Sequence, residues 1–213
     1  MRIGIICSIE REVNLFKNEM VDFQNEVKEE QAFGIGTIHG KKIYLVHIND
    51  STIEEAQKAC QLLITEYKCA KLLFIGFAGA LDSKLSPLRM VICRKHIVHE
   101  TGKIFSSDNS LSALLQKTYP PAQYCDVITY EEFVTKIEEK KQIKEQYPNV
   151  KAVDMESGYL AEVATAHAIP FVSLRAITDN ANDQASKNFS RYEHLASTKT
   201  VDIIIEILKG RLN

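Results

Sequence analysis

The stretch Leu72-Leu73-Phe74-Ile75-Gly76-Phe77-Ala78-Gly79-Ala80 decides the fold, because four consecutive apolar residues run straight into a segment with two glycines. A short apolar run bounded by glycine is typical of a strand buried on both faces, as in a parallel sheet. Open α/β sheets place their ligand crevices just beyond the carboxyl ends of such strands. We therefore predict a strand over residues 72–75, a turn over 76–80, and a ligand site at that turn.

Strands and helices alternate on both sides of this stretch. The remaining predicted strands cover residues 3–7, 31–39, 42–48, 90–93, 126–129, 150–154 and 171–177, with 31–39 and 42–48 forming a hairpin around Gly40-Lys41. The predicted helices cover residues 52–67, 138–146, 157–167 and 195–208, and the polar segment 106–112 is predicted to be a loop leading into a short helix. Ser8 is the expected N-cap of a helix that begins near Glu10. This alternation predicts one α/β domain with a sheet between two helical layers.

The composition excludes several classes of protein. The chain has 213 residues, 45% of them hydrophobic and 25% charged, which is enough to build a core without disulfides or metals, and we expect a single domain over residues 1–213. The formal net charge is -2 and no block of basic residues stands out, so nucleic acid is not an expected partner.

The cysteines and the start of the chain bear on location. The five cysteines stand singly in apolar segments, without a C-x-x-C pair, as expected of reduced thiols in a cytoplasmic protein. The apolar start ends before Glu10, too soon for a signal peptide or a membrane span, so no membrane partner is expected. His96 and His99 lie three residues apart without further ligands nearby, and we predict no metal site.

Three acids follow predicted strands closely. Glu12 comes soon after the first strand, Glu156 lies in Val-Asp-Met-Glu-Ser, and Asp179 ends Leu-Arg-Ala-Ile-Thr-Asp. Each acid alone fits the N-terminal charge of a helix. Because the ends of parallel strands converge at one sheet edge, the three together indicate a carboxylate-rich site.

The segments around these acids resemble the nucleoside phosphorylase and nucleosidase superfamily, and within it the methylthioadenosine/S-adenosylhomocysteine nucleosidases. Met1-Arg2-Ile3-Gly4-Ile5-Ile6 with Glu10-Arg11-Glu12-Val13 resembles the family's amino terminus. Ala152-Val153-Asp154-Met155-Glu156-Ser157 resembles its ribose-binding segment, and Val172-Ser173-Leu174-Arg175-Ala176-Ile177-Thr178-Asp179 resembles the segment that ends in its catalytic aspartate. The motifs occur in order, and the resemblance runs from Met1 to the final helix. It implies a three-layer α/β/α sandwich of the phosphorylase type, with a central mixed sheet flanked by helices.

The resemblance also implies roles for these residues. Cleavage of a purine N-glycosidic bond builds positive charge on the sugar and negative charge on the base, so it needs an acid at the base and an activated water at the anomeric carbon. Asp179 would serve the purine N7, and Glu12 would orient and deprotonate the water. Glu156 would accept the two ribose hydroxyls, with Met155 packed on the sugar. Arg175 either helps to place the water and balance the carboxylates or forms a structural salt bridge.

Other positions concern the base and the 5′ group. Phe133 would stack on the purine while the Val134 backbone reads its edge, or both are plain core residues. Phe77 stands where the family has a hydroxyl. Residues 49–52 replace a glycine-containing family segment, and 96–109 is shorter than the family loop that helps to close the 5′-substituent pocket.

These observations predict a hydrolase that cleaves the N-glycosidic bond of a purine nucleoside and needs no metal or organic cofactor. Methylthioadenosine and S-adenosylhomocysteine are the favoured substrates, which implies a place in methionine salvage. The alternatives are a nucleosidase for another 5′-modified nucleoside such as futalosine, a purine nucleoside phosphorylase, and a catalytically silent nucleoside-binding protein. The resemblance further implies a homodimer through residues 79–88, where we expect exposed Leu81, Leu85, Pro87 and Leu88 to need cover.

Overall fold

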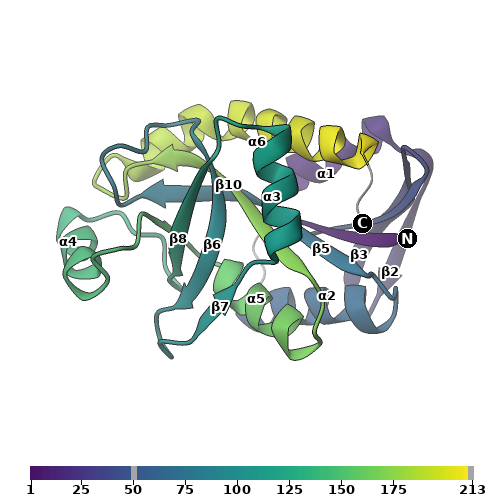
Figure 1. The fold of residues 1–213 in the computed structure, drawn as a ribbon, viewed down its shortest axis with the longest axis horizontal. Helices are drawn as coiled ribbons and strands as arrows, with labels where there is room; N and C mark the ends of the chain where they lie inside the picture. Colours follow the sequence, from purple (N-terminus) through teal and green to yellow (C-terminus); the bar gives the residue numbers. More distant parts are fainter. Residues whose placement is uncertain (49–51, 211–213) are drawn as a thin grey trace.

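The computed structural model describes residues 1–48 and 52–210, which form ten strands and six helices (Figure 1). The strands are β1 (Arg2–Cys7), β2 (Val21–Lys28), β3 (Gln31–Ile38), β4 (Lys41–His47), β5 (Lys71–Ala80), β6 (Met90–Val98), β7 (Ile104–Ser106), β8 (Gln123–Thr129), β9 (Ala152–Asp154) and β10 (Phe171–Asp179). The helices are α1 (Glu10–Glu19), α2 (Ile53–Thr65), α3 (Asn109–Thr118), α4 (Ile137–Gln146), α5 (Ser157–Ala166) and α6 (Ala185–Lys209).

All the strands belong to one mixed sheet. β5 lies at its centre and pairs in parallel with β1 on one side and with β10 on the other. Beyond β1 the sheet continues through β4, β3 and the edge strand β2. Beyond β10 it passes through β6, β8 and β9, and β9 pairs again with β5. Half of the sheet therefore closes into a ring of β5, β10, β6, β8 and β9, a closure that the sequence did not predict.

Helices cover both faces of the sheet, as the predicted three-layer architecture requires (Figure 1). α1, α3 and α6 lie on one face, where Phe16, Leu115 and Ile204 join a core with residues of β1 and β10. α2 and α5 lie on the other face, where Leu63 and Leu160 join a second core with residues of β4 and β5. The predicted α/β class, with a central mixed sheet flanked by helices, is confirmed.

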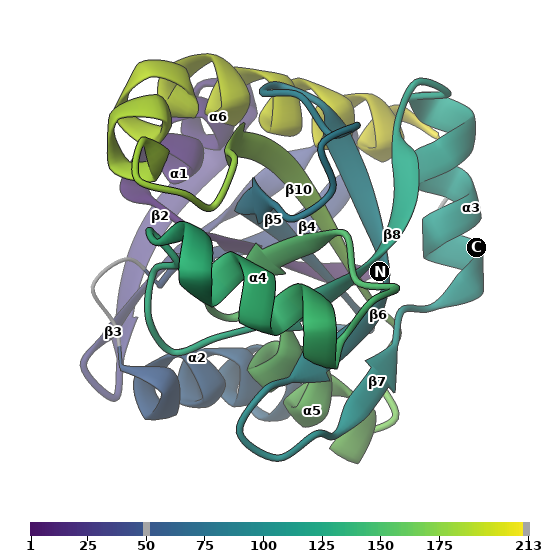
Figure 2. The ribbon, with the colours of Figure 1, turned by 90° about the vertical axis from the view of Figure 1, so that its left-hand side faces the viewer.

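α4 stands apart from these layers and lies in front of the ends of β5 and β10 (Figure 2). Its Ile143 is buried against the end of the ring with Ile128 and Val150. Its Lys140 Nζ donates to the carbonyl oxygens of Ala80 and Asn180, both at 2.7 Å. The charged helix that the sequence predicted here is therefore anchored over the ends of the two central strands.

Most predicted elements are confirmed to within a few residues, and the exceptions have physical reasons. The prediction of a turn over residues 76–80 is wrong, because β10 pairs with β5 from Leu72 to Gly79 and keeps this segment extended. α6 begins at Ala185, ten residues earlier than predicted, and β2 and β7 carry too little apolar pattern to have been predicted. Residues 49–51, part of the segment that departs from the family, lie outside the described residues.

The segment expected to form the dimer interface exposes less apolar surface than predicted. Leu81 and Leu85 are buried inside the chain, so they need no cover from a second subunit, while Pro87 and Leu88 are half-buried. Their burial follows from the ring, where Leu85 packs with Val91 and Val127.

None of the described helices is both long enough and apolar enough to cross a membrane.

Candidate active site

A cavity of about 400 Å³ opens at the carboxyl ends of the central parallel strands, within the range of small-molecule sites. Of the predicted site residues, Phe77, Phe133, Val134, Met155, Glu156 and Asp179 line it. Glu12 and Arg175 are fully buried and lie behind its wall. The described lining residues include five carboxylates and neither lysine nor arginine. The fold therefore gathers residues far apart in sequence into one acidic cavity.

Asp179 closes β10 and is fixed by its neighbours. Its Oδ2 accepts from the Thr178 hydroxyl at 2.9 Å, and its Oδ1 accepts from the backbone N–H of Ala181 at 2.8 Å. Burial raises the pKa of the Asp179 carboxyl, although these hydrogen bonds and the charge of Lys140 act against that shift. A carboxyl with a raised pKa is suited to hold a proton at a cavity wall.

Glu12 lies in the first turn of α1, and its side chain reaches back to the residues at the start of that helix. Its Oε2 accepts from the backbone N–H of Ser8 at 2.8 Å and of Ile9 at 3.3 Å, and its Oε1 lies 3.4 Å from the Thr200 hydroxyl. Ile9 occupies the N-cap position, so the prediction that Ser8 would cap the helix is wrong. Burial raises the pKa of Glu12 to about 7, against the opposing effects of these hydrogen bonds and of Arg175.

Arg175 is the cation at the centre of this site. Its Nε and Nη2 lie 3.0 and 2.9 Å from Asp154 Oδ2, and its Nη2 lies 3.7 Å from Glu156 Oε2. Its guanidinium stacks 3.5 Å from the centre of the Phe74 ring. The salt bridge that the sequence left open is therefore present, and Arg175, behind the wall, also lies close to Glu156, which lines the cavity.

Glu156 immediately precedes α5, so its carboxylate projects from the start of that helix into the cavity. Burial raises its pKa to about 7, while Arg175 acts to lower it. Its neighbour Met155 is 36% exposed, and that exposed surface faces the cavity. A carboxylate beside an exposed thioether suits a ligand with paired hydroxyls on one side and an apolar face on the other.

Aromatic side chains form another part of the wall. Phe77 and Phe189 meet edge to face with their ring centres 5.3 Å apart, and Phe133 meets Phe189 at 6.1 Å. Phe133 is 38% exposed, more than a core phenylalanine would be, and Val134 beside it is buried. A planar apolar ligand could contact this cluster without displacing polar groups.

Sequence reasoning missed several residues of the site, among them Ser8 as a lining residue, Asp154, Tyr159 and Phe189. Asp154 carried a usable signal, because an acid that follows two apolar strand residues needs a cationic partner once it is buried. Phe189 carried none, since it lies in the part of α6 that was not predicted to be helical.

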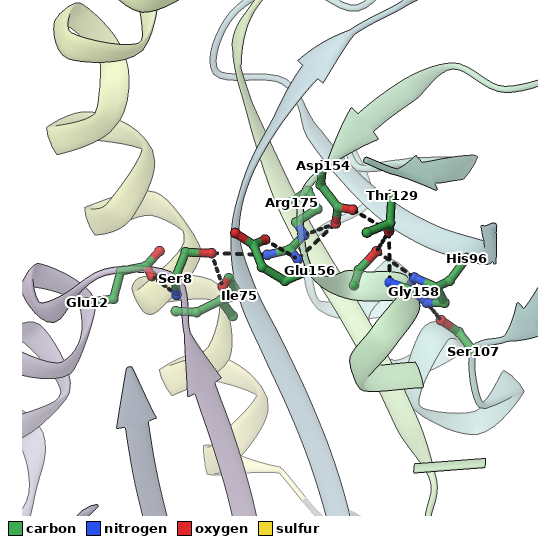
Figure 3. A network of polar contacts seen from close by, with 11 residues as sticks. Ser8, Glu12, Ile75, His96, Ser107, Thr129, Asp154, Glu156, Gly158 and Arg175 are labelled. Carbon is green, nitrogen blue, oxygen red and sulfur yellow. Dashed lines mark hydrogen bonds and ion pairs between the residues drawn. The ribbon is translucent and has the colours of Figure 1, made fainter. Parts of the chain in front are cut away.

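The two histidines considered as metal ligands, His96 and His99, both contact other side chains of the protein. His96 is buried and its ring nitrogens lie 2.9 Å from the Ser157 hydroxyl and 3.0 Å from the Ser107 hydroxyl (Figure 3). His99 stacks on Tyr130 at 3.9 Å. Across the described ranges, no group of three or more potential metal ligands comes together.

This fold and site define a class. The chain belongs to the phosphorylase superfamily, whose family model matches residues 2–209. It is 30% identical to the 5′-methylthioadenosine/S-adenosylhomocysteine nucleosidase of Listeria welshimeri and 31% identical to that of Listeria innocua, each over 232 aligned residues that cover 98% of this chain and 99% of the relative.

Solved structures share the fold. The MTA/SAH nucleosidase of Streptococcus pneumoniae, in complex with 8-aminoadenine, superposes with a TM-score of 0.94 over 99% of this chain and 100% of that chain, at 24% identity. A futalosine hydrolase mutant of Helicobacter pylori superposes with a TM-score of 0.91 over 98% of each chain, at 20% identity. The resemblance drawn from the sequence motifs is confirmed.

Proposed function

We propose that this chain hydrolyses the N-glycosidic bond of a purine nucleoside, with methylthioadenosine and S-adenosylhomocysteine as its substrates. The observation that carries the proposal is the pair of acids on either side of β5. Asp179 ends β10 and Glu12 follows β1, and these strands flank β5 in the sheet. An acid for the base therefore lines the cavity, and an acid for the water lies behind its wall on the other side of β5.

The reaction uses each acid in a different protonation state. Asp179 gives its proton to the purine N7 as the bond between the sugar and N9 breaks, so the electron pair of that bond leaves with a neutral base. Glu12, as a carboxylate, takes a proton from the water that adds to the anomeric carbon. Arg175 keeps the surrounding carboxylates in charge balance through Asp154 and Glu156.

The substrate is oriented by the remaining lining residues. Glu156 accepts the ribose hydroxyls, and Met155 packs on the sugar. Phe133 stacks on the purine, the Val134 backbone reads its edge, and Phe77 narrows the cavity beside them. These roles rest on the position of each residue in the cavity and on the family resemblance.

The aliphatic part of the lining supports an apolar 5′ group. The cavity is also lined by four aliphatic residues from just beyond β1 and β4 and from α2: Ile9, Ile48, Ile53 and Ala56. Such a surface suits a thioether better than a hydroxyl or a phosphate. The name of the Listeria relatives favours the same substrates.

The acidic lining also supports water as the attacking group. A phosphate dianion would enter a cavity whose described lining holds five acidic side chains and no lysine or arginine. Repulsion between like charges in a partly dry cavity disfavours that anion, while water meets no such penalty.

The test is a chromatographic panel. Methylthioadenosine, S-adenosylhomocysteine, futalosine, adenosine and inosine are each incubated with the protein, with and without phosphate. We expect adenine and a free ribose derivative from the first two, at rates independent of phosphate. A phosphorylated sugar would assign the protein to the phosphorylases, and release of base from futalosine alone would assign it to the futalosine hydrolases. No cleavage, with a nucleoside that still raises Tm, would make it a binding protein.

We also propose that residues 1–213 act as one domain, and that the protein is a homodimer, works in the cytoplasm and takes part in methionine salvage. All five cysteines are free and buried, which suits a reducing compartment. The salvage role depends on methylthioadenosine being the substrate.

A further inference from the structure

Ser8 contacts both of the buried site residues, Glu12 and Arg175. It follows β1 directly, is half-buried, and lines the cavity. Its backbone N–H donates to Glu12 at 2.8 Å, and its hydroxyl lies 3.3 Å from Arg175 Nη1 (Figure 3). No hydrogen bond or ion pair links Glu12 and Arg175 directly in the part of the chain that the structure describes, so Ser8 stands between them.

The Ser8 hydroxyl has one unused position. It donates its hydrogen to the carbonyl oxygen of Ile75 at 3.2 Å and accepts from Arg175, which can only donate. A hydroxyl oxygen accepts two hydrogen bonds, so one lone pair remains. Because the residue lines the cavity, that lone pair is available to a molecule inside it.

The protein gives this hydroxyl a dedicated space. Gly76, with a φ of +152°, lies opposite it, and a Cβ at that position would fall 1.8 Å from Ser8 Oγ and 2.6 Å from Arg175 Nη1. Phe77, the next residue, has no hydroxyl to offer. Only a glycine at position 76 lets a serine reach this point from the neighbouring strand.

We propose that Ser8 is the positioning residue for the attacking water, an inference that rests on the proposed hydrolytic function. Water donates one O–H to Ser8 Oγ and the other to Glu12, which turns an oxygen lone pair toward the anomeric carbon. The oxygen bonds to that carbon while the bond to N9 breaks, Glu12 takes the water proton, and the purine takes the proton of Asp179.

Competition between methanol and water as the attacking group distinguishes a positioning role of Ser8 from a packing role. Methanol has one O–H to give to Glu12 and none left for Ser8, and it carries a methyl group in place of the second hydrogen. Wild-type enzyme should therefore select water over methanol, and Ser8→Ala should lose that selection. Ser8→Ala keeps the backbone N–H of residue 8, so its hydrogen bond to the Glu12 carboxylate remains.

The experiment compares wild type, Ser8→Ala and Ser110→Ala with methylthioadenosine in water and in dilute methanol. Ser110 is an exposed serine on α3 whose hydroxyl donates to Asp108, and it serves as the matched control. We expect Ser8→Ala to lower kcat roughly tenfold, the size of one lost hydrogen bond, with KM changed by less than about threefold. The ratio of methyl glycoside to free sugar should rise severalfold in Ser8→Ala only.

The ratio of products does not depend on how much of the variant is folded, so a loss of stability cannot hide it. An unchanged ratio would overturn the proposal even if kcat falls, because the serine would then act through packing alone. Unchanged kcat and ratio would overturn it as well. Failure of the wild type to cleave any nucleoside would instead remove the proposed function, and this inference with it.

Discussion

Glu12 is an acid that the fold holds in an unfavourable place for a charge. It is fully buried, and burial raises its pKa from 4.5 to about 7 even though backbone N–H groups of Ser8 and Ile9 stabilise the carboxylate. A base with a pKa near the working pH is efficient, because enough of it is ionised and it still takes up a proton readily. That arrangement lowers the free energy of unfolding of the chain.

This loss of stability has a predictable pH dependence. Between about pH 4.5 and 7 the unfolded chain releases the Glu12 proton before the folded chain does, so the free energy of unfolding falls as pH rises. Glutamine does not titrate. We therefore expect the Tm of Glu12→Gln minus that of wild type to increase as the pH rises from 5 to 8. Thermal unfolding at each pH measures this difference. A difference that stays constant across this range would contradict the raised pKa.

Asp179 should matter for turnover much more than for binding. We expect Asp179→Asn to lower kcat for methylthioadenosine by roughly a hundredfold or more, because a positioned proton donor is lost, while the Kd changes by only a few-fold. Stopped assays give kcat, and titration calorimetry with the slow variant gives Kd. Asp183→Asn, an exposed acid four residues further on, is the control and should behave as wild type. A kcat within a few-fold of wild type would exclude Asp179 as the proton donor.

Among the elements, β5 carries the architecture of the site. It pairs with β1, β10 and β9, so the residues at its end are placed by three neighbouring strands. Gly76 lies inside β5, where β1 and β10 bring Ser8 and Arg175 within contact distance. A side chain at this position would have to displace one of them.

We expect Gly76→Ala to destabilise the protein by about 1–3 kcal/mol, as overpacking of a core does. The corresponding fall in Tm is several degrees for a chain of this size. Gly102→Ala is the matched control, since Gly102 also has a positive φ, +65°, but nothing lies within 4 Å of its added Cβ. Equal losses in the two variants would show that backbone conformation, and not contact with Ser8 and Arg175, explains the glycine.

At the scale of the whole molecule, we expect two chains to assemble into a homodimer. The segment 79–88 that the resemblance assigns to a dimer interface keeps Pro87 and Leu88 half-buried, while Leu81 and Leu85 are inside the core. We expect light scattering at micromolar concentration to give twice the chain mass of 24.1 kDa. Pro87→Asp should shift the mass toward a monomer, and Val27→Asp, on the exposed edge strand β2, should not. A monomeric wild type would remove the homodimer proposal.

The sequence by itself determined the class of fold and predicted six of the residues that line the cavity. Buried parallel strands need near-continuous apolar residues, which made the central strands visible in sequence. An acid near the end of a strand leaves a short motif, such as the one around Glu156 or Asp179. Such signals depend on residues that are neighbours along the chain. For that reason they could be read without knowing what lies across the sheet.

Only the tertiary structure decided how those parts meet. The closure of the ring through β9 and β5, the burial of Leu81 and Leu85, and the contact of Phe189 with Phe77 join segments distant in sequence. Ser8 shows the same limit, because its place as a cap was the natural local prediction, whereas its hydroxyl is held by Ile75 on β5 and Arg175 on β10. Local propensity is weaker than the hydrogen bonds and packing that the completed sheet supplies, and those exist only once the chain has folded.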